Sequence, residues 1–105
     1  MEHLDNLKAT EFIPGIIGRF VHGEQSTLSF VYLKQGSRLP EHRHVHEQIT
    51  YIVEGNLEMV IGGDTYMFSA GMVHVIPSNV PHSAVAHTDC RVIDAFSPAR
   101  DDYKF

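Results

Sequence analysis

The sequence has a single cysteine and no long apolar run. With only Cys90 available, no internal disulfide can form, which fits a reducing compartment. No stretch approaches the roughly 20 apolar residues that span a bilayer. The first residues, Met-Glu-His-Leu-Asp, lack the basic and then apolar segments of a signal peptide. We therefore expect a cytoplasmic protein that does not bind membranes.

Positive charge is also scarce. The 105 residues carry 8 lysines and arginines against 13 aspartates and glutamates, a formal net charge of -5. Nucleic-acid binding usually needs a basic face, so we expect no nucleic-acid partner. The length suggests one domain over residues 1–105, small enough to gain stability from a second subunit. Residues 12–21 are apolar enough to add to a partner's sheet, which predicts a homodimer.

Turn-forming residues recur every few positions, and no segment carries a convincing helical period. The segments between them number about nine and have the composition of short strands. Residues 27–34 alternate clearly, with Leu28, Phe30 and Tyr32 on one face. We expect strands within residues 12–21, 27–34, 42–53, 57–61, 65–68, 73–76, 83–86 and 90–96. This pattern predicts an all-β sandwich or small barrel.

Eight histidines stand out in the composition, and three of them are spaced two apart, at His42, His44 and His46. If this stretch runs as one strand, the three histidines and Gln48 share one face, whereas Glu47 points away. Imidazole is the commonest protein ligand for transition metals. Imidazoles and an amide on one face therefore predict part of a metal site, which a histidine from elsewhere in the chain would complete.

Two motifs resemble those of the cupin family. The first is a glycine, then His-x-His, a Glu or Gln and another glycine, and the second is a glycine, a proline and a histidine. The matching positions are Gly36, His42, His44, Gln48 and Gly55, followed by Gly71, Pro77 and His82. The resemblance covers a core of about residues 27–96 and implies a double-stranded β-helix, a jelly-roll-like barrel. It also implies one divalent metal ion, held by His42, His44, Gln48 and His82.

Gln48 stands where the family usually has a glutamate, so the ligand set is three neutral imidazoles and a neutral amide. Such a site should bind metal more weakly than a carboxylate site and polarise a bound oxygen more strongly. Zinc, nickel, copper and iron suit these ligands and manganese is also possible, so the sequence does not select the metal. We expect His46 to line the cavity rather than ligate. A metal-free cupin with histidines as polar core residues is the alternative.

Residues 90–103 resemble the C-terminal segment of the KdgF-type pectin-degradation cupins. Their pattern of an aspartate, an aromatic residue two positions later and an arginine after a proline fits Asp94, Phe96 and Arg100. The resemblance implies linearisation and ketonisation of 4,5-unsaturated monouronates from pectin or alginate. In that reaction Asp94 would shuttle a proton, Arg100 would bind the substrate carboxylate in bidentate fashion, and Phe96 would pack against the sugar.

Other interpretations stay open at this point. Asp94 and Arg100 could pair with each other and only brace the C-terminal tail. Open metal positions also fit a cupin dioxygenase that uses iron or another redox metal. The small size fits a non-enzymatic metal-binding or ligand-binding module. For the enzyme, the expected partner is a small molecule, most concretely an acidic sugar.

Overall fold

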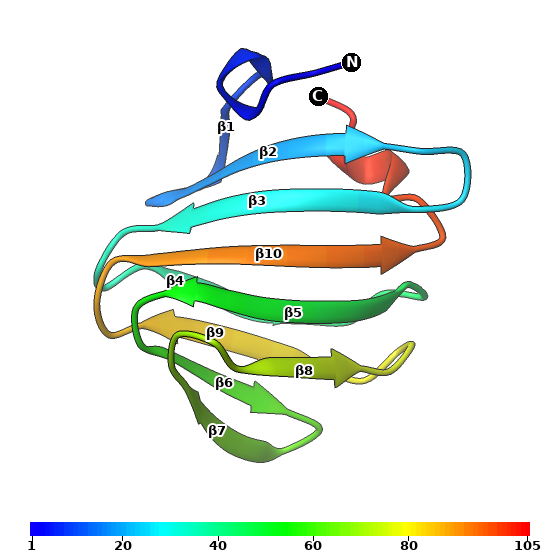
Figure 1. The fold of residues 1–105 in the computed structure, drawn as a ribbon. Helices are drawn as coiled ribbons and strands as arrows, with labels where there is room; N and C mark the ends of the chain where they lie inside the picture. Colours follow the sequence, from blue (N-terminus) through cyan, green and yellow to red (C-terminus); the bar gives the residue numbers. More distant parts are fainter.

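The computed structural model describes residues 1–105 and is built almost entirely of β-strands (Figure 1). Two short 3-10 turns, η1 (Leu4–Asn6) and η2 (Asp101–Tyr103), flank the strands. Neither is long and apolar enough to cross a membrane. The ten strands are β1 (Thr10–Ile13), β2 (Ile16–His22), β3 (Thr27–Leu33), β4 (Arg38–His42), β5 (Glu47–Glu54), β6 (Leu57–Ile61), β7 (Asp64–Phe68), β8 (Val73–Ile76), β9 (His82–Ala86) and β10 (Cys90–Ser97).

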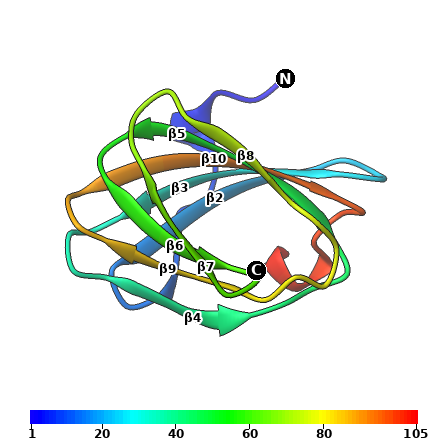
Figure 2. The same cartoon turned by 90° about the horizontal axis from the view of Figure 1, so that it is seen from below.

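The strands form two antiparallel sheets that face each other (Figure 2). One sheet has six strands in the order β1-β2-β3-β10-β5-β8, and the other has four in the order β4-β9-β6-β7. The two sheets are not joined by strand pairing, so the structure is a sandwich rather than a fully closed barrel. The predicted all-β, jelly-roll-like fold is confirmed.

The core between the sheets follows from the alternation of side chains along each strand. On β6, Leu57, Met59 and Ile61 point inward, and Ala84 and Ala86 of the neighbouring β9 leave room for them. Burial of each large side chain contributes about 1.5–3 kcal/mol relative to leaving it exposed. These residues fix the distance between the sheets and so position the end of the sandwich where the histidines lie.

The inward face of the six-stranded sheet changes from apolar to polar along its length. Val92 and Ile52 are register partners near one end, and both are buried. Two residues further along β10, Asp94 is the register partner of both Ser29 on β3 and Thr50 on β5. Buried polar groups are costly unless they are hydrogen-bonded. A row of them inside a small core therefore indicates a functional cavity.

The histidine-rich stretch does not form one strand, so that prediction was wrong. β4 ends at His42 and β5 begins at Glu47 in the other sheet. Residues 43–46 cross between the sheets, and the carbonyl groups of His44 and Val45 bond to the loop before β9 instead of to a strand. The backbone N–H of Asn79 donates to the His44 carbonyl at 2.8 Å, and the Ser78 hydroxyl donates to the Val45 carbonyl at 2.6 Å.

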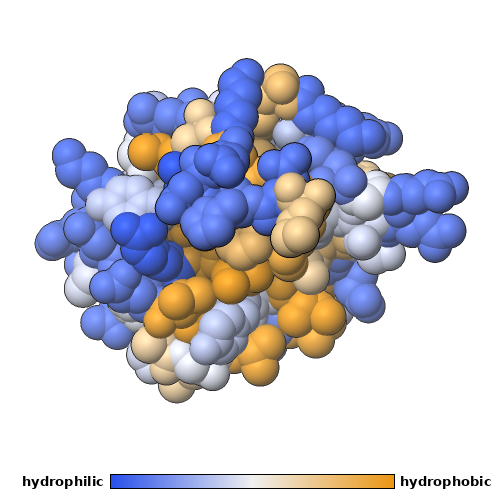
Figure 3. Space-filling view, turned by 45° about the horizontal axis from the view of Figure 1, so that its top comes forward, coloured by the Kyte–Doolittle hydropathy of each residue, from blue (hydrophilic) through white to orange (hydrophobic).

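The six-stranded sheet exposes an apolar outer surface. Leu28, Phe30 and Tyr32 share one face of β3, as predicted. That face is the outer one, because Ser29 and Leu33, which alternate with these residues, are buried. We call the exposed apolar side chains of this surface the outer apolar face, and it includes Leu28, Ile49, Tyr51, Val53, Val73 and Val75. Apolar side chains gather over this sheet in the lower half of Figure 3.

Candidate metal centre

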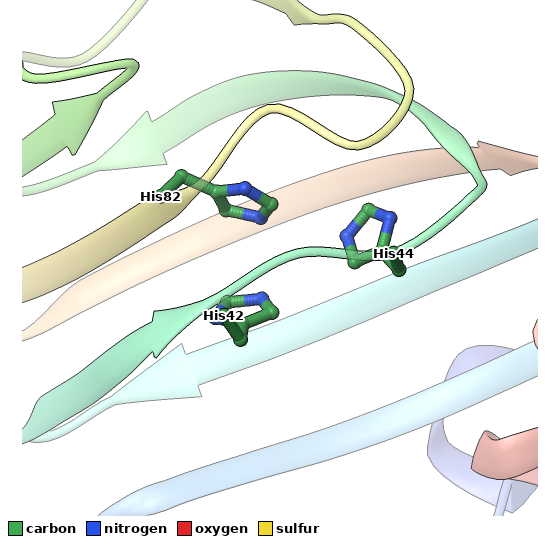
Figure 4. A group of neighbouring side chains, drawn as sticks. All are labelled: His42, His44 and His82. Carbon is green, nitrogen blue, oxygen red and sulfur yellow. The ribbon is translucent and has the colours of Figure 1, made fainter.

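Three imidazoles meet at one end of the sandwich (Figure 4). His42 ends β4, His44 lies in the crossing between the sheets, and His82 begins β9. His42 and His82 are also register partners in the β4–β9 pair. One ring nitrogen from each of the three histidines lies within 4.8 Å of the other two. These side chains could hold a metal ion.

Each imidazole is oriented by a hydrogen bond to the backbone. A carbonyl oxygen only accepts, so the ring nitrogen that faces it, Nδ1, carries the hydrogen. Nε2 of each ring is then the atom with a free lone pair, as ligation by neutral imidazole requires. The carbonyl partners of Nδ1 are Pro40 for His42 at 2.9 Å, His46 for His44 at 3.0 Å, and Val80 for His82 at 2.9 Å.

The Nε2 atoms of His44 and His82 are better placed to bind a cation than to form hydrogen bonds within the protein. Nε2 of His82 is buried and has no hydrogen-bond partner. Nε2 of His44 lies 3.2 Å from Oε1 of Gln48, although both atoms are acceptors once Nδ1 of His44 is protonated. A cation between these acceptors would replace repulsion by attraction. Three imidazoles and a carboxamide oxygen suit a divalent transition metal, and the set does not distinguish among the candidates.

The side-chain amide of Gln48 is oriented by hydrogen bonds to residues on the side away from the histidines. Its Nε2 donates to Oγ1 of Thr50 at 2.9 Å and to Oδ1 of Asp94 at 3.2 Å. Thr50 Oγ1 donates in turn to the same carboxylate oxygen at 2.7 Å. Because both amide hydrogens find acceptors there, the network assigns Oε1 to the side of the histidines.

Burial and neighbouring charge set the protonation of the site. Burial, followed by the charge of Arg100 and then by His82, lowers the pKa of His44 to about 4. Burial also lowers the pKa of His82. Both rings are therefore neutral at pH 7 and able to ligate a metal. Burial raises the pKa of Asp94 to about 6, against hydrogen bonds that favour its carboxylate, so this group exchanges a proton near neutral pH.

A small cavity lies beside His42 and Gln48. It has about 50 Å³ of free volume, enough for water but not for a sugar. Its apolar walls come from the core, and Phe96 closes it beside the polar residues. Asp94 is half-buried and lines this cavity. The polar lining consists of Ser29, His42, Gln48, Thr50 and Asp94.

A larger groove opens to solvent on the other side of His42. Its volume is about 460 Å³, within the range of small-molecule sites. His42 lines both the groove and the inner cavity. A ligand in the groove would therefore contact His42 of the cluster directly. The walls are formed by β1, β4 and the C-terminal segment, and they include Phe12, Leu39, Glu41, Arg100, Asp102 and Tyr103.

Arg100 is clamped at this groove by an acid and two aromatic rings. Its Nε and Nη2 donate to the two carboxylate oxygens of Asp102 at 3.0 and 2.8 Å. Its guanidinium carbon lies 4.0 Å from the ring centroid of Tyr103 and 4.7 Å from that of Phe96. Nη1 is buried without a partner. Arg100 thus pairs with Asp102 and not with Asp94, unlike the alternative raised from the sequence.

The C-terminal segment is tied to the six-stranded sheet by residues that sequence reasoning missed. The hydroxyl oxygen of Thr27 accepts the backbone N–H of Arg100 at 2.8 Å and lies 2.9 Å from Nδ1 of His22. The other nitrogen of His22 lies 3.3 Å from the Tyr103 carbonyl. Thr50 was also missed, although it follows Gln48 by two residues and so shares its strand face. The role of Asp102 could not be predicted, because it lies in a short turn whose sequence shows no periodic pattern of apolar and polar residues.

His46 and Glu47 remain outside the cluster. The ring of His46 lies edge-on to His44, with centroids 5.3 Å apart, and its Nδ1 is buried without a partner. It is not among the three histidines whose nitrogens converge. The side chain of Glu47 is exposed at the start of β5.

Known proteins resemble this chain in sequence and structure. The family model described as cupin domain matches residues 29–96. The pectin degradation protein KdgF of Dickeya dadantii (strain 3937) is 33% identical over 75 residues, which cover 70% of this chain and 68% of that protein. The solved structure of KdgF from Halomonas sp. has a TM-score of 0.85 and 35% sequence identity, and the match covers 90% of this chain and 89% of that chain.

A second solved structure extends over nearly the whole chain. An RmlC-like cupin from Shewanella frigidimarina NCIMB 400 has a TM-score of 0.90 and 27% sequence identity, and the match covers 98% of this chain and 96% of that one. The family match includes His42, His44 and His82. The chain therefore belongs to the cupin family.

Proposed function

We propose that this chain is a metal-dependent enzyme that opens and ketonises 4,5-unsaturated monouronates, small acidic sugars derived from pectin or alginate. The observation that carries this proposal is the groove in which His42 of the histidine cluster and the clamped Arg100 lie together. A cation site and a fixed guanidinium in one groove suit an anionic ligand. The two KdgF proteins, one of them named for pectin degradation, support the class of sugar.

His42, His44, His82 and Gln48 would hold the metal. When bound to these neutral ligands, a divalent ion supplies undiminished positive charge that polarises substrate oxygens. The protein's own contribution is to keep the rings of His44 and His82 neutral and to hold Nδ1 of all three rings in hydrogen bonds to backbone carbonyls. Zinc, nickel, iron, manganese and copper are all candidates.

Arg100 would bind the substrate carboxylate. Asp102 occupies Nε and one hydrogen of Nη2. An end-on bidentate contact would use the other Nη2 hydrogen together with Nη1, which is buried without a partner and would have to become accessible from the groove. The side chain is already immobilised between Phe96 and Tyr103. It therefore loses little conformational entropy when the carboxylate binds. Phe96 lines the inner cavity and not the groove, so its role toward a sugar in the groove would be to hold the guanidinium rather than to pack against the sugar itself.

Asp94 would move the proton. The reaction is an isomerisation: loss of the proton from O1 forms the C1 aldehyde, breaks the C1–O5 bond and leaves the electron pair on O5. Protonation at C4 then converts the resulting enolate to the C5 ketone. Asp94, whose pKa is raised to about 6 by burial, lines the inner cavity and not the groove. It would take the proton from O1 and deliver it to C4 through a water molecule in that cavity. One proton leaves and one arrives, so the carboxyl returns to its starting state.

The decisive test follows the ultraviolet absorbance of the conjugated enol in a 4,5-unsaturated galacturonate. Protein loaded with each candidate metal should speed the decay above the spontaneous rate, and chelator should abolish the effect. Asp94→Asn should slow it strongly, whereas the exposed Asp64→Asn should not. No acceleration with any of the five metals would sink the proposal. Oxygen uptake during turnover would point instead to the dioxygenase.

We also propose that the enzyme works as a homodimer in the cytoplasm. The apolar residues from Phe12 to Phe20 are less available for a partner than the sequence suggested, because Phe12 and Phe20 pack on Tyr103. The outer apolar face is the better candidate surface. Exposed, contiguous apolar side chains of this kind mark interaction sites in small proteins.

A further inference from the structure

The hydrogen bonds behind Gln48 point to a role for Thr50. We propose that Thr50 and Asp94 are positioning residues that fix the Gln48 amide with its oxygen toward the three imidazoles. We further infer that they make glutamine, rather than the glutamate usual in the family, the residue that fits position 48. This inference rests on the proposed function, because it concerns the fourth ligand of the proposed metal centre.

Every polar hydrogen of this network has one acceptor. Gln48 gives one amide hydrogen to Thr50 and the other to Asp94, and Thr50 gives its hydroxyl hydrogen to the same oxygen of Asp94. A flipped amide would place Oε1 against the carboxylate and against a hydroxyl already donating elsewhere. Two hydrogen bonds would be lost and only one, to the free lone pair of Nε2 of His44, would be gained, so the network favours the orientation with Oε1 toward the histidines.

Strand geometry makes the network rigid. Gln48 and Thr50 lie two residues apart on one face of β5, and Asp94 on β10 is the register partner of Thr50. Gln48 is 6% exposed and Thr50 is 3% exposed. Solvent therefore competes little for these hydrogen bonds, and their strength is greater than on the surface.

A glutamate at position 48 would break the same network. One of its carboxylate oxygens would occupy the place of Nε2, 3.2 Å from Oδ1 of Asp94, with no hydrogen between them. The single hydrogen of Thr50 cannot serve both acids. An asparagine at position 94 would reverse the polarity: its amide would donate to the new carboxylate and to Thr50, and Thr50 would donate to the new carboxylate. The paired change Q48E/D94N therefore rebuilds a closed network, whereas Q48E alone does not.

The first test needs neither metal nor substrate. Melting temperatures of the chelator-treated wild type, Q48E, D94N and Q48E/D94N are compared at pH 8. We expect Q48E to melt at least about 5 °C below the wild type and the paired change to recover most of that loss. Such coupling is the signature of direct contact. Additive effects of the two substitutions would overturn the inference.

The second test titrates each protein with Co²⁺ and follows its visible absorbance. Thr50→Val removes the hydroxyl at constant shape and should weaken Co²⁺ binding about tenfold, as loss of an outer hydrogen-bond partner does, while Thr50→Ser should restore it. Thr10→Val is the matched control, because Thr10 Oγ1 is buried without any partner. Unchanged binding in T50V would overturn the inference.

Failure of the inference can be told from failure of the proposed function. If the wild type and T50V bind Co²⁺ equally well, only the role of Thr50 is contradicted. A wild type that binds no Co²⁺, Zn²⁺ or Ni²⁺ contradicts the metal-dependent function itself. If T50V does not fold, the melting cycle of Q48E and D94N decides, since it does not involve that variant.

Discussion

His42 and His82 are register partners on β4 and β9, and their ring centroids lie 4.2 Å apart. The strand pair and two backbone carbonyls hold the two rings in this geometry. Binding of an ion therefore needs little rearrangement of the chain, and most of the interaction energy appears as affinity.

Substitution of His82 by alanine should abolish specific metal binding. It removes one of three converging nitrogens, a larger loss than the roughly 10–100-fold that an outer-shell partner costs. A metal that binds the native state raises the melting temperature, so the Co²⁺-dependent shift seen with the wild type should vanish in H82A. His87→Ala, which changes an exposed histidine paired with Glu58, should keep the shift. A full shift in H82A would remove His82 from the ligand set.

Asp102→Asn should weaken the binding of acidic substrate without disabling the chemistry. Asp102 holds one edge of Arg100, and without its charge the guanidinium must be ordered when substrate binds. Ordering one long side chain costs about 0.5–1.5 kcal/mol, so KM should rise about two- to tenfold while kcat changes less. Asp101→Asn is the matched control, because Asp101 pairs only with Lys104 at the surface. An unchanged KM for D102N would show that the clamp is dispensable.

The strands were predictable wherever the signal was local. Residues 57–61 and 73–76 form strands with the expected bounds, because alternation and turn residues act over a few positions. Alternation could not decide which face of residues 27–33 is buried, since Thr27, Ser29 and Val31 are no more apolar than Leu28, Phe30 and Tyr32. Burial there depends on which sheet lies opposite.

The candidate site was reached through its motifs and not through periodicity. His44 does not lie on a strand with His42, as the alternation argument required. It reaches the cluster because Ser78 and Asn79, distant in sequence, hold the crossing. No local pattern encodes such a contact. For the same reason Asp102 and Thr27 were found only in the structure.

The first-motif glycine at position 55 should tolerate alanine worse than Gly63. Both have positive φ, +95° and +86°, where an L side chain costs about 1–2 kcal/mol. A Cβ at Gly55 would also lie 2.3 Å from the Asp89 carbonyl oxygen and 2.8 Å from Cys90 Sγ, whereas one at Gly63 meets nothing within 4 Å. In urea unfolding, G63A should therefore lose about 1 kcal/mol and G55A about 3 kcal/mol or more. Equal losses would mean that backbone strain alone explains the glycine.

Val73→Glu should convert a dimer into a monomer. Val73 is 62% exposed on the outer apolar face and is the register partner of Tyr51, so a buried charge there would oppose association. Sedimentation velocity should show a dimer for the wild type and a monomer for V73E. Met67→Glu, at a 56% exposed position on β7 of the other sheet, should remain dimeric. A monomeric wild type would end the homodimer proposal.

Metal-free protein should lose stability as the pH falls from about 6.5 toward 4. Burial lowers the pKa of His44 from 6.5 to about 4 and also lowers that of His82. Between these pH values the two imidazoles bind more protons in the unfolded chain than in the native state, so a fall in pH favours unfolding. Asp94 acts in the opposite direction: its pKa rises from 3.8 to about 6, so the native state holds a proton that the unfolded chain has released.

Two histidines outweigh one aspartate, which leaves a net loss of stability in acid. Asp94→Asn removes the opposing contribution and should make the fall in melting temperature between pH 6.5 and 4 steeper, whereas His44→Gln should make it shallower. Thermal unfolding in chelator at several pH values measures both slopes, with the exposed His3→Gln as the control. An unchanged slope in D94N would mean that the carboxyl group of Asp94 titrates as an ordinary surface acid, and a shallower slope would mean that its pKa is lowered in the native state. In either case Asp94 would lack the raised pKa on which its proposed role as proton carrier depends.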